Sequence, residues 1–151
     1  PAENSRAGSG SVLSRNWPDP RCASNDSCGM NGERIVVDTS ALVDYAKGVP
    51  EVAARIEGFE AHISIITEIE FLAWPGMSEE RMPDAHAFLR EFYSTGISDS
   101  IRDLAALLKR NHKLKLPDAI IAATARHLKA PLLTRDKGFN RIAEQVEVRL
   151  V

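Results

Sequence analysis

Short apolar segments alternate with longer segments of helical apolar spacing from Arg34 to the end of the chain. Short apolar runs bounded by polar residues are typical of buried strands. A chain that alternates strands with helices folds as βαβ units, which give a parallel sheet with helices on both faces. We therefore predict a three-layer α/β/α domain with a mostly parallel central sheet. The expected strands are residues 34–37, 61–65, 96–98, 131–134 and 146–150.

Residues that begin or end helices separate the helical segments. Thr39 or Ser40 is suited to cap the first helix, and Gly48 to end it. In residues 78–93 the apolar side chains recur every three or four positions, which is the spacing of an amphipathic helix. The expected helices are residues 40–47, 49–57, 67–74, 78–93, 99–112, 118–128 and 137–145.

Residues 1–29 differ from the rest of the chain because they are rich in Ser, Asn, Gly and Pro and show no period. Such a segment buries too little apolar surface to offset the entropy of ordering it. We expect a disordered leader derived from an expression vector, with a native disordered arm as the alternative, and a folded domain over residues 30–151. Cys22 and Cys28 lie in this leader without histidines at ligand spacing, so no zinc site is expected.

The composition excludes a membrane span and does not by itself favour a nucleic-acid binder. No apolar run approaches the roughly 18 residues that a spanning helix needs. The first residues lack the apolar stretch of a secretory signal, so we expect a cytoplasmic protein. The net charge is −2, whereas proteins that neutralise phosphates usually carry a basic excess. If four acids hold a divalent cation, however, the remaining surface is mildly basic.

Four acidic residues fall close to the ends of the predicted strands. Asp38 directly follows the first strand, Asp136 lies two residues after the fourth, and Glu70 lies in the helix after the second. Ligand sites of such sheets lie beyond the carboxyl ends of the strands. Asp118 begins the helix that precedes the fourth strand, so it joins the other three only if that helix starts at the same edge.

Each of these acids also has a structural explanation. Asp38 and Asp136 precede helices and are suited to cap them. Glu70 completes a capping box with Thr67, and Asp118 in a first helical turn is favoured by the helix dipole. For Glu70 and Asp118 taken singly the structural role is the better interpretation, whereas for the other two the alternatives are balanced. Taken together, four acids at loop ends of one sheet favour a functional site.

The chemistry of such a cluster points to a metal ion. Carboxylates a few ångströms apart repel one another unless a cation neutralises them. A hard divalent ion prefers oxygen ligands and lowers the pKa of a bound water enough to make it a nucleophile. Two ions about 3.5–4 Å apart clamp the attacking and leaving oxygens of a phosphodiester. Metal-assisted phosphodiester hydrolysis is therefore the expected reaction.

Four segments of the chain resemble those of a PIN domain, and more narrowly those of the toxin ribonucleases of VapBC-type toxin–antitoxin pairs. The resemblance runs from about Ile35 to the C-terminus, and its most specific parts are the LPDAIIAATA and LTRD sequences. The segments are VVDTSALVDY (36–45), SIITEIEFLAWPG (64–76), LPDAIIAATA (116–125) and LLTRDKGF (132–139).

This resemblance implies an endonuclease that uses Mg²⁺ or Mn²⁺ to cut RNA, often structured RNA such as tRNA. It also implies a homodimer and an antitoxin whose C-terminal tail blocks the active site. Glu70 matches the family's glutamate better than Glu68 does, because it follows the Ser64-x-x-Thr67-x-x spacing. The implied catalytic and metal-binding residues are Asp38, Glu70, Asp118 and Asp136, with supporting groups from Thr39, Ser40 and Thr134.

Other residues carry weaker expectations. Arg135 and Lys137 flank Asp136 and are candidate RNA contacts, whereas the basic residues 109–115 fit better as a solvated helix end. Asp99 is an extra acid or, as we favour, a helix cap. Trp74 belongs to an insertion relative to the family pattern; we expect it in the core, with a place in the antitoxin groove as the alternative.

Two other function classes remain as alternatives. One is a catalytically inactive PIN-like scaffold that only binds proteins. The other is a metal-dependent phosphatase of another α/β family; the haloacid dehalogenase type requires a second acid two residues after the first, where Ser40 stands. Dinucleotide binding is excluded because no GxGxxG turn follows the first strand.

Overall fold

The computed structural model describes residues 32–151, so the predictions about the leader lie outside the described residues. In the described part of the chain, five strands form one sheet in the order β3-β2-β1-β4-β5, and every neighbouring pair is parallel. The strands are β1 (Arg34–Val37), β2 (Glu60–Ser64), β3 (Tyr93–Thr95), β4 (Leu132–Thr134) and β5 (Val148–Leu150). The helices are α1 (Thr39–Ala46), α2 (Pro50–Ile56), α3 (Ile65–Leu72), α4 (Met82–Leu89), α5 (Asp99–His112), α6 (Leu116–Leu128) and the 3₁₀ helix η1 (Lys137–Ile142).

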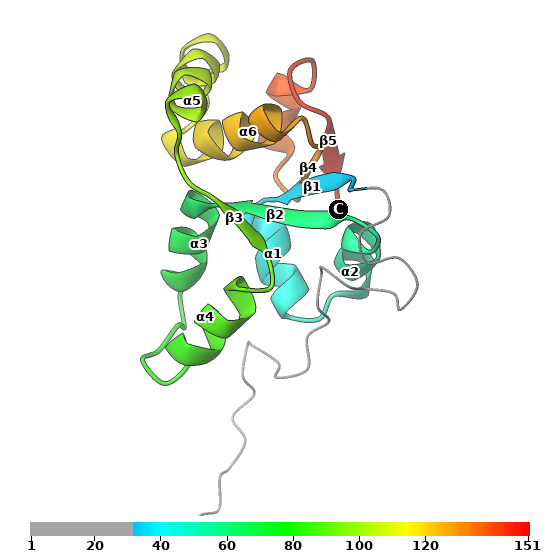
Figure 1. The fold of residues 1–151 in the computed structure, drawn as a ribbon, viewed down its shortest axis with the longest axis vertical. Helices are drawn as coiled ribbons and strands as arrows, with labels where there is room; N and C mark the ends of the chain where they lie inside the picture. The colour runs from blue at the N-terminus through cyan, green and yellow to red at the C-terminus, as the bar shows by residue number, and fades with distance from the viewer. Residues whose placement is uncertain (1–31) are drawn as a thin grey trace, which may run out of the picture.

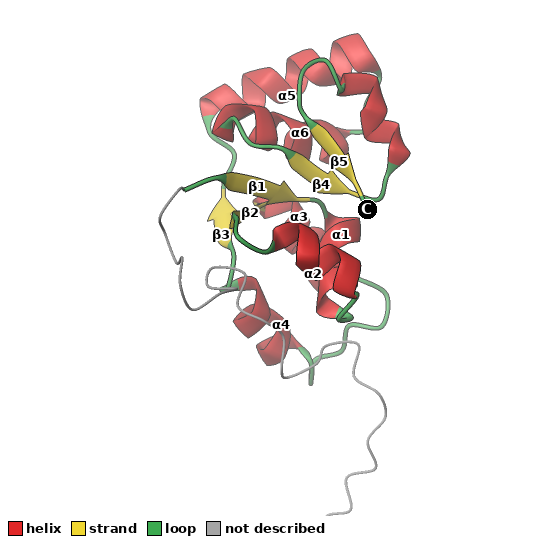
Figure 2. Ribbon diagram, turned by 90° about the vertical axis from the view of Figure 1, so that its right-hand side faces the viewer, coloured by secondary structure: helices red, strands yellow, loops and turns green. Residues whose placement is uncertain are grey.

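Helices cover both faces of the sheet, as the alternation of segments predicted (Figures 1 and 2). Successive strand residues point to opposite faces, so Ile35 and Val37 enter one core and Val36 enters the other. The first core packs against α1, α2, α3 and α4, and the second against α5, α6 and η1. The predicted three-layer α/β/α architecture is confirmed.

The segment around α4 departs from the prediction. The helix ends at Leu89, and β3 occupies Tyr93–Thr95 where it pairs with His62–Ser64, so the expected strand at 96–98 is wrong. Phe92 extended the helical spacing of the sequence, yet it lies in a turn and fills the core beside α4. Because Phe92 is buried beside α4 without belonging to it, the apolar spacing predicted a helix that extends beyond its observed end at Leu89.

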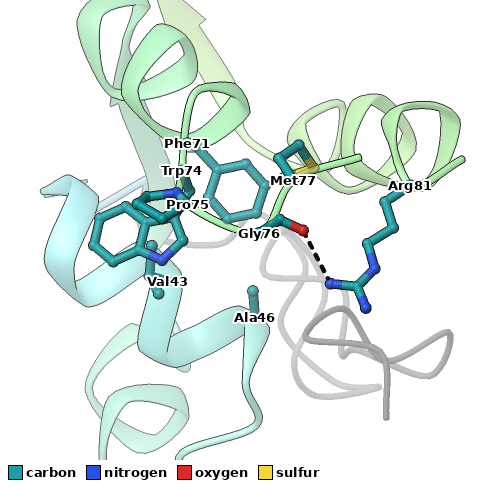
Figure 3. A pocket seen from close by; sticks show the side chains of 8 residues that line it. All are labelled: Val43, Ala46, Phe71, Trp74, Pro75, Gly76, Met77 and Arg81. Atoms are coloured by element: carbon teal, nitrogen blue, oxygen red, sulfur yellow. Dashed lines mark hydrogen bonds between the residues drawn. The ribbon is translucent and has the colours of Figure 1, made fainter. Parts of the chain in front are cut away.

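The turn after α3 forms an apolar pocket above α1 (Figure 3). Gly76 adopts a φ of +92°, a conformation that favours glycine, and its carbonyl accepts a hydrogen bond of 3.2 Å from Arg81 Nη1. Trp74 is 38% exposed and lines the pocket, so its predicted place in the core is wrong. The other lining residues are Val43, Ala46, Phe71, Pro75 and Met77.

Over residues 32–151, none of the helices combines the length and apolar character needed to cross a membrane.

Candidate active site

The sheet brings the loops that follow β1 and β4 together. The two strands are neighbours, and the Asp38 N–H donates to the Leu133 carbonyl oxygen at 2.9 Å. Asp38 directly follows β1, and Asp136 follows β4 after one intervening residue. Because the strands are parallel, both acids lie at the carboxyl-terminal edge of the sheet, where the sequence predicted the site.

Asp38 is bound by side-chain hydroxyls and does not cap a helix. It stands at the N-cap position of α1, but its side chain accepts no capping hydrogen bond. Its Oδ2 accepts hydrogen bonds from Ser40 Oγ at 2.9 Å and from Thr134 Oγ1 at 2.7 Å. The residue is only 6% exposed, so these hydroxyls fix the orientation of a nearly buried carboxylate. Ser40 and Thr134 thus orient Asp38 through their hydroxyls.

The Thr134 hydroxyl also connects Asp38 to Asp136. While it donates to Asp38, its oxygen accepts the Asp136 N–H at 3.0 Å. Asp136 Oδ1 in turn accepts the Gly138 N–H at 2.7 Å, so Asp136 caps η1, which was one of the two alternatives left open for it. A Cβ at Gly138 would lie 2.9 Å from this same oxygen. A glycine at this position therefore leaves room for the carboxylate in its present orientation.

Glu70 is held by Thr39 and not by a capping box. The N-cap of α3 is Ser64, whose Oγ accepts the Ile66 N–H at 3.2 Å, so the predicted box between Thr67 and Glu70 is wrong. Instead Glu70 Oε2 accepts a short hydrogen bond from Thr39 Oγ1. Thr39 adjoins Asp38, so this bond brings the Glu70 carboxylate towards the same edge of the sheet.

Asp118 lies in the first turn of α6, where the charges of the other three acids act on it. Burial raises the pKa of Asp118, and the negative charges of Asp38, Asp136 and Glu70 raise it further, while the nearby Lys115 acts in the opposite direction. Three other carboxylates therefore lie close enough to Asp118 for their charges to act on it, and we refer to the four acids as the cluster. Asp118 therefore joins the other three acids, a point that the sequence alone left open.

The donor set fits a hard divalent cation. In the described part of the chain, no three His, Cys, Asp or Glu side chains are already arranged around one ion position. The cluster nevertheless offers four carboxylates and supporting hydroxyls, all of them oxygen ligands of the kind that Mg²⁺ and Mn²⁺ prefer. The pKa of Asp118 is raised first by burial and then by the negative charges of three other carboxylates, and a bound cation would neutralise those charges.

The guanidinium of Arg135, a candidate RNA contact, is paired with a carboxylate of the protein. Its Nη1 donates to Asp44 Oδ2 at 2.6 Å, and its backbone N–H donates to Ser40 Oγ at 3.2 Å. Asp44 is only 7% exposed and was missed by the sequence reasoning. The sequence feature that could have identified Asp44 is its charge within the otherwise apolar run of α1, four residues after Ser40. Lys137, the other candidate RNA contact, is exposed.

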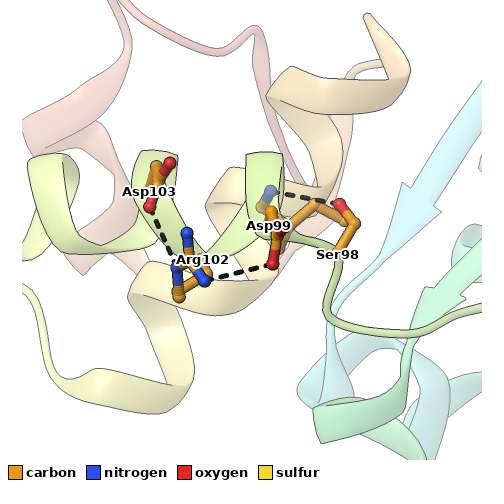
Figure 4. A network of polar contacts seen from close by, with 5 residues as sticks. Ser98, Asp99, Arg102 and Asp103 are labelled. Carbon is orange, nitrogen blue, oxygen red and sulfur yellow. Dashed lines mark hydrogen bonds and ion pairs between the residues drawn. The ribbon is translucent and has the colours of Figure 1, made fainter.

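Asp99 belongs to a separate polar network at the start of α5 (Figure 4). The cap of α5 is Ser98, whose Oγ accepts the Ile101 N–H at 3.2 Å, so the capping role predicted for Asp99 is wrong. The Asp99 side chain is 93% exposed and pairs with Arg102 at 3.1 Å. It is a first-turn acid of α5, bound to its own helix, and is not among the carboxylates whose charges act on Asp118.

Comparisons with known proteins agree with this geometry. The PIN domain family matches residues 35–145. Ribonuclease VapC1 of Methanocaldococcus jannaschii is 34% identical over 120 residues, which cover 74% of this chain and 82% of that protein. A toxin–antitoxin complex from Klebsiella pneumoniae contains a chain of 30% identity with a TM-score of 0.66, and the match covers 76% of this chain and 95% of that one.

A second solved structure, VapBC-1 from nontypeable Haemophilus influenzae, shares the fold. Its TM-score is also 0.66, at 20% identity, and the match covers 77% of this chain and 96% of that one. The family match spans more than half of the chain and includes all four acids of the cluster. The resemblance noted in the sequence is thereby confirmed, and this chain belongs to the PIN-domain family, on the branch of the VapC-type ribonucleases.

Proposed function

We propose that this protein is a Mg²⁺- or Mn²⁺-dependent endoribonuclease of the cytoplasm and the toxin of a toxin–antitoxin pair. The observation that carries the proposal is the electrostatic cluster of Asp38, Glu70, Asp118 and Asp136, contributed by four separate segments of the chain. Family membership supports the reaction, since the curated relative VapC1 is a ribonuclease.

The four carboxylates would hold the metal. When bound, the ion supplies an activated water and neutralises negative charge at the phosphodiester. The protein's own contribution is to orient the carboxylates, because a carboxylate held in one rotamer loses less entropy when it binds a ligand. Ser40 and Thr134 orient Asp38, and Thr39 orients Glu70. Without a cation the cluster repels the phosphates of RNA, so cleavage depends on the metal.

Exposed lysines beside the cluster are suited to hold the RNA backbone. Lys115 is exposed and close enough to lower the pKa of Asp118, and Lys137 is exposed one residue after Asp136. Ammonium groups at these positions would contact phosphates without reading sequence. Structured RNA such as tRNA is the substrate class that the family resemblance implies. Lys109, Arg110 and His112 lie in the last turn of α5, which agrees with their role as a solvated helix end.

A cognate antitoxin is the proposed protein partner. The relative from Klebsiella pneumoniae, at 30% identity, was solved as a toxin–antitoxin complex. The homodimer rests on the family resemblance alone, and size-exclusion chromatography with light scattering tests it. Trp74 lines an apolar pocket, which supports the alternative prediction for this residue, namely that it helps form the groove that receives the antitoxin.

The decisive experiment measures cleavage of a labelled structured RNA by the purified protein in Mn²⁺, in Mg²⁺ and in excess EDTA. The test variant is Asp118→Asn, and the matched control is Asp99→Asn, an exposed acid outside the cluster. We expect cleavage only with metal, loss of activity in the first variant and wild-type activity in the second, with both variants folded by circular dichroism. Cleavage that persists in EDTA or in Asp118→Asn would refute the assignment.

The same experiment separates the alternatives. An inactive scaffold would bind neither Mn²⁺ nor RNA at this cluster, and all variants would behave alike. A phosphatase would release phosphate from a phosphomonoester and leave internal RNA bonds intact.

A further inference from the structure

We propose that Arg135 is a positioning residue, and that its ion pair with Asp44 sets the metal affinity of the cluster by holding the loop of residues 134–136 against α1. The inference rests on the proposed function, because it concerns the same site. It replaces the predicted role of Arg135 as a phosphate ligand.

Arg135 is bonded to α1 at two points. Its guanidinium contacts Asp44 at 2.6 Å, and its backbone N–H contacts the Ser40 hydroxyl at 3.2 Å. Ser40 and Asp44 are four residues apart in one helix, so they lie on the same side of it, one turn from each other. The two bonds therefore fix both the position and the direction of the chain as it leaves β4.

Each residue of this loop is connected to the carboxylates. Thr134 donates to Asp38 and accepts the Asp136 N–H, while Arg135 donates to the same Ser40 hydroxyl that donates to Asp38. A shift of the loop away from α1 would thus disturb the hydroxyls on Asp38 and move Asp136 at the same time. Metal sites depend on such outer contacts, because these orient the ligands.

Charge explains why the guanidinium stays on Asp44. The carboxylate is almost fully buried, and among residues 32–151 Arg135 is its cationic partner. A buried carboxylate without a partner is strongly destabilising, so the pair persists although the arginine side chain is 58% exposed. A guanidinium held in this way is directed at α1, which leaves the exposed Lys115 and Lys137 beside the site for the RNA backbone.

A double-mutant cycle on Mn²⁺ binding tests the proposal. The variants are Arg135→Gln, Asp44→Asn, the double variant and Arg135→Lys, with the exposed Arg55→Gln on α2 as the charge-matched control. We expect each of the first two to weaken Mn²⁺ binding about tenfold, the range typical of outer-sphere metal contacts. The double variant should be no weaker than either single one, since all three remove the same interaction. Arg135→Lys should restore part of the affinity.

RNA kinetics distinguish positioning from phosphate binding. A positioning role lowers kcat in both single variants and leaves KM within about twofold. A phosphate ligand would instead raise KM in Arg135→Gln and reduce the salt dependence of RNA binding by about one ion, whereas Asp44→Asn would leave both unchanged. That second pattern, or an unchanged Mn²⁺ affinity in Arg135→Gln, overturns the inference.

A measurement on the metal-free protein separates this inference from the proposed function. Amide hydrogen exchange at residues 134–138 should be faster in Arg135→Gln than in the wild type or in Arg55→Gln. A wild-type protein that neither binds Mn²⁺ nor cuts RNA would overturn both proposals. A wild type that does both, with an Arg135→Gln variant of unaltered exchange and affinity, would overturn only this one. The double variant leaves no unpaired buried charge, so it carries the same test even if one of the single variants does not fold.

Discussion

The hydroxyl of Thr134 is the contact through which the structure can be tested most directly. Thr134 is fully buried, and valine has nearly the same shape but cannot form a hydrogen bond. In Thr134→Val, Asp38 loses one of its two hydroxyl donors, and the Asp136 N–H loses its acceptor. The packing of β4 is left almost unchanged, so the variant isolates the two hydrogen bonds.

The expected loss follows from these contacts. A hydrogen bond to a charged group contributes about 1.5–3 kcal/mol, and the neutral one adds about 1 kcal/mol. Burial of a methyl group in place of a hydroxyl offsets roughly 1 kcal/mol. We therefore expect the free energy of unfolding to fall by about 2 kcal/mol, and Tm by roughly 6–10 °C for a domain of this size.

Urea denaturation of the metal-free protein at pH 7, followed by circular dichroism, measures this difference. Thr134→Ser is the matched control, because it keeps the hydroxyl and loses only a methyl group, at about 1 kcal/mol. The valine variant should be clearly the less stable of the two. If it is as stable as the wild type, or more stable than the serine variant, the Thr134 hydroxyl does not hold the carboxylate as described.

Three further predictions concern single residues. In Asp118→Asn the metal-free protein should gain thermal stability at pH 7, because folding penalises an ionised group whose pKa is raised. The gain in stability should vanish as pH falls towards the ordinary pKa of 3.8. A gain that instead grows in acid would contradict the raised pKa. Gly138→Ala should weaken Mn²⁺ binding in calorimetry about tenfold and change the free energy of unfolding by less than about 1 kcal/mol, because the added Cβ displaces only the Asp136 carboxylate. Lys113→Gly should raise the free energy of unfolding in urea by about 0.5–1 kcal/mol, since residue 113 ends α5 at a φ of +54°, whereas Lys109→Gly within the same helix should lower it by about 1 kcal/mol.

Local patterns sufficed for most of the elements. The segment 34–37 was predicted as β1, and α5 was predicted with the bounds that it has, because the apolar spacing of residues 101–108 marks its buried face. The errors lie where packing overrides local pattern, as at Phe92, or where a residue expected in a strand caps the following helix, as Ser64 does.

The four acids were also identified from the sequence, because strand ends and helix starts are local features. Their mutual arrangement was not. The sequence left open whether α6 begins at the right edge of the sheet, and it gave Glu70 a partner within its own helix where the structure gives it Thr39. From the sequence, Arg135 was predicted to contact the RNA, whereas in the fold its side chain pairs with Asp44, 91 residues earlier in the chain.

The sequence by itself determined the order of strands and helices and the positions at which carboxylates occur, since both depend on neighbours a few residues apart. Only the tertiary structure decided which carboxylates share charge and which hydroxyl or guanidinium holds each of them. Those choices depend on contacts between segments up to 96 residues apart, such as Thr134 with Asp38. Such contacts form only when parallel pairing of β1 with β4 brings their ends together, and no local pattern encodes that pairing.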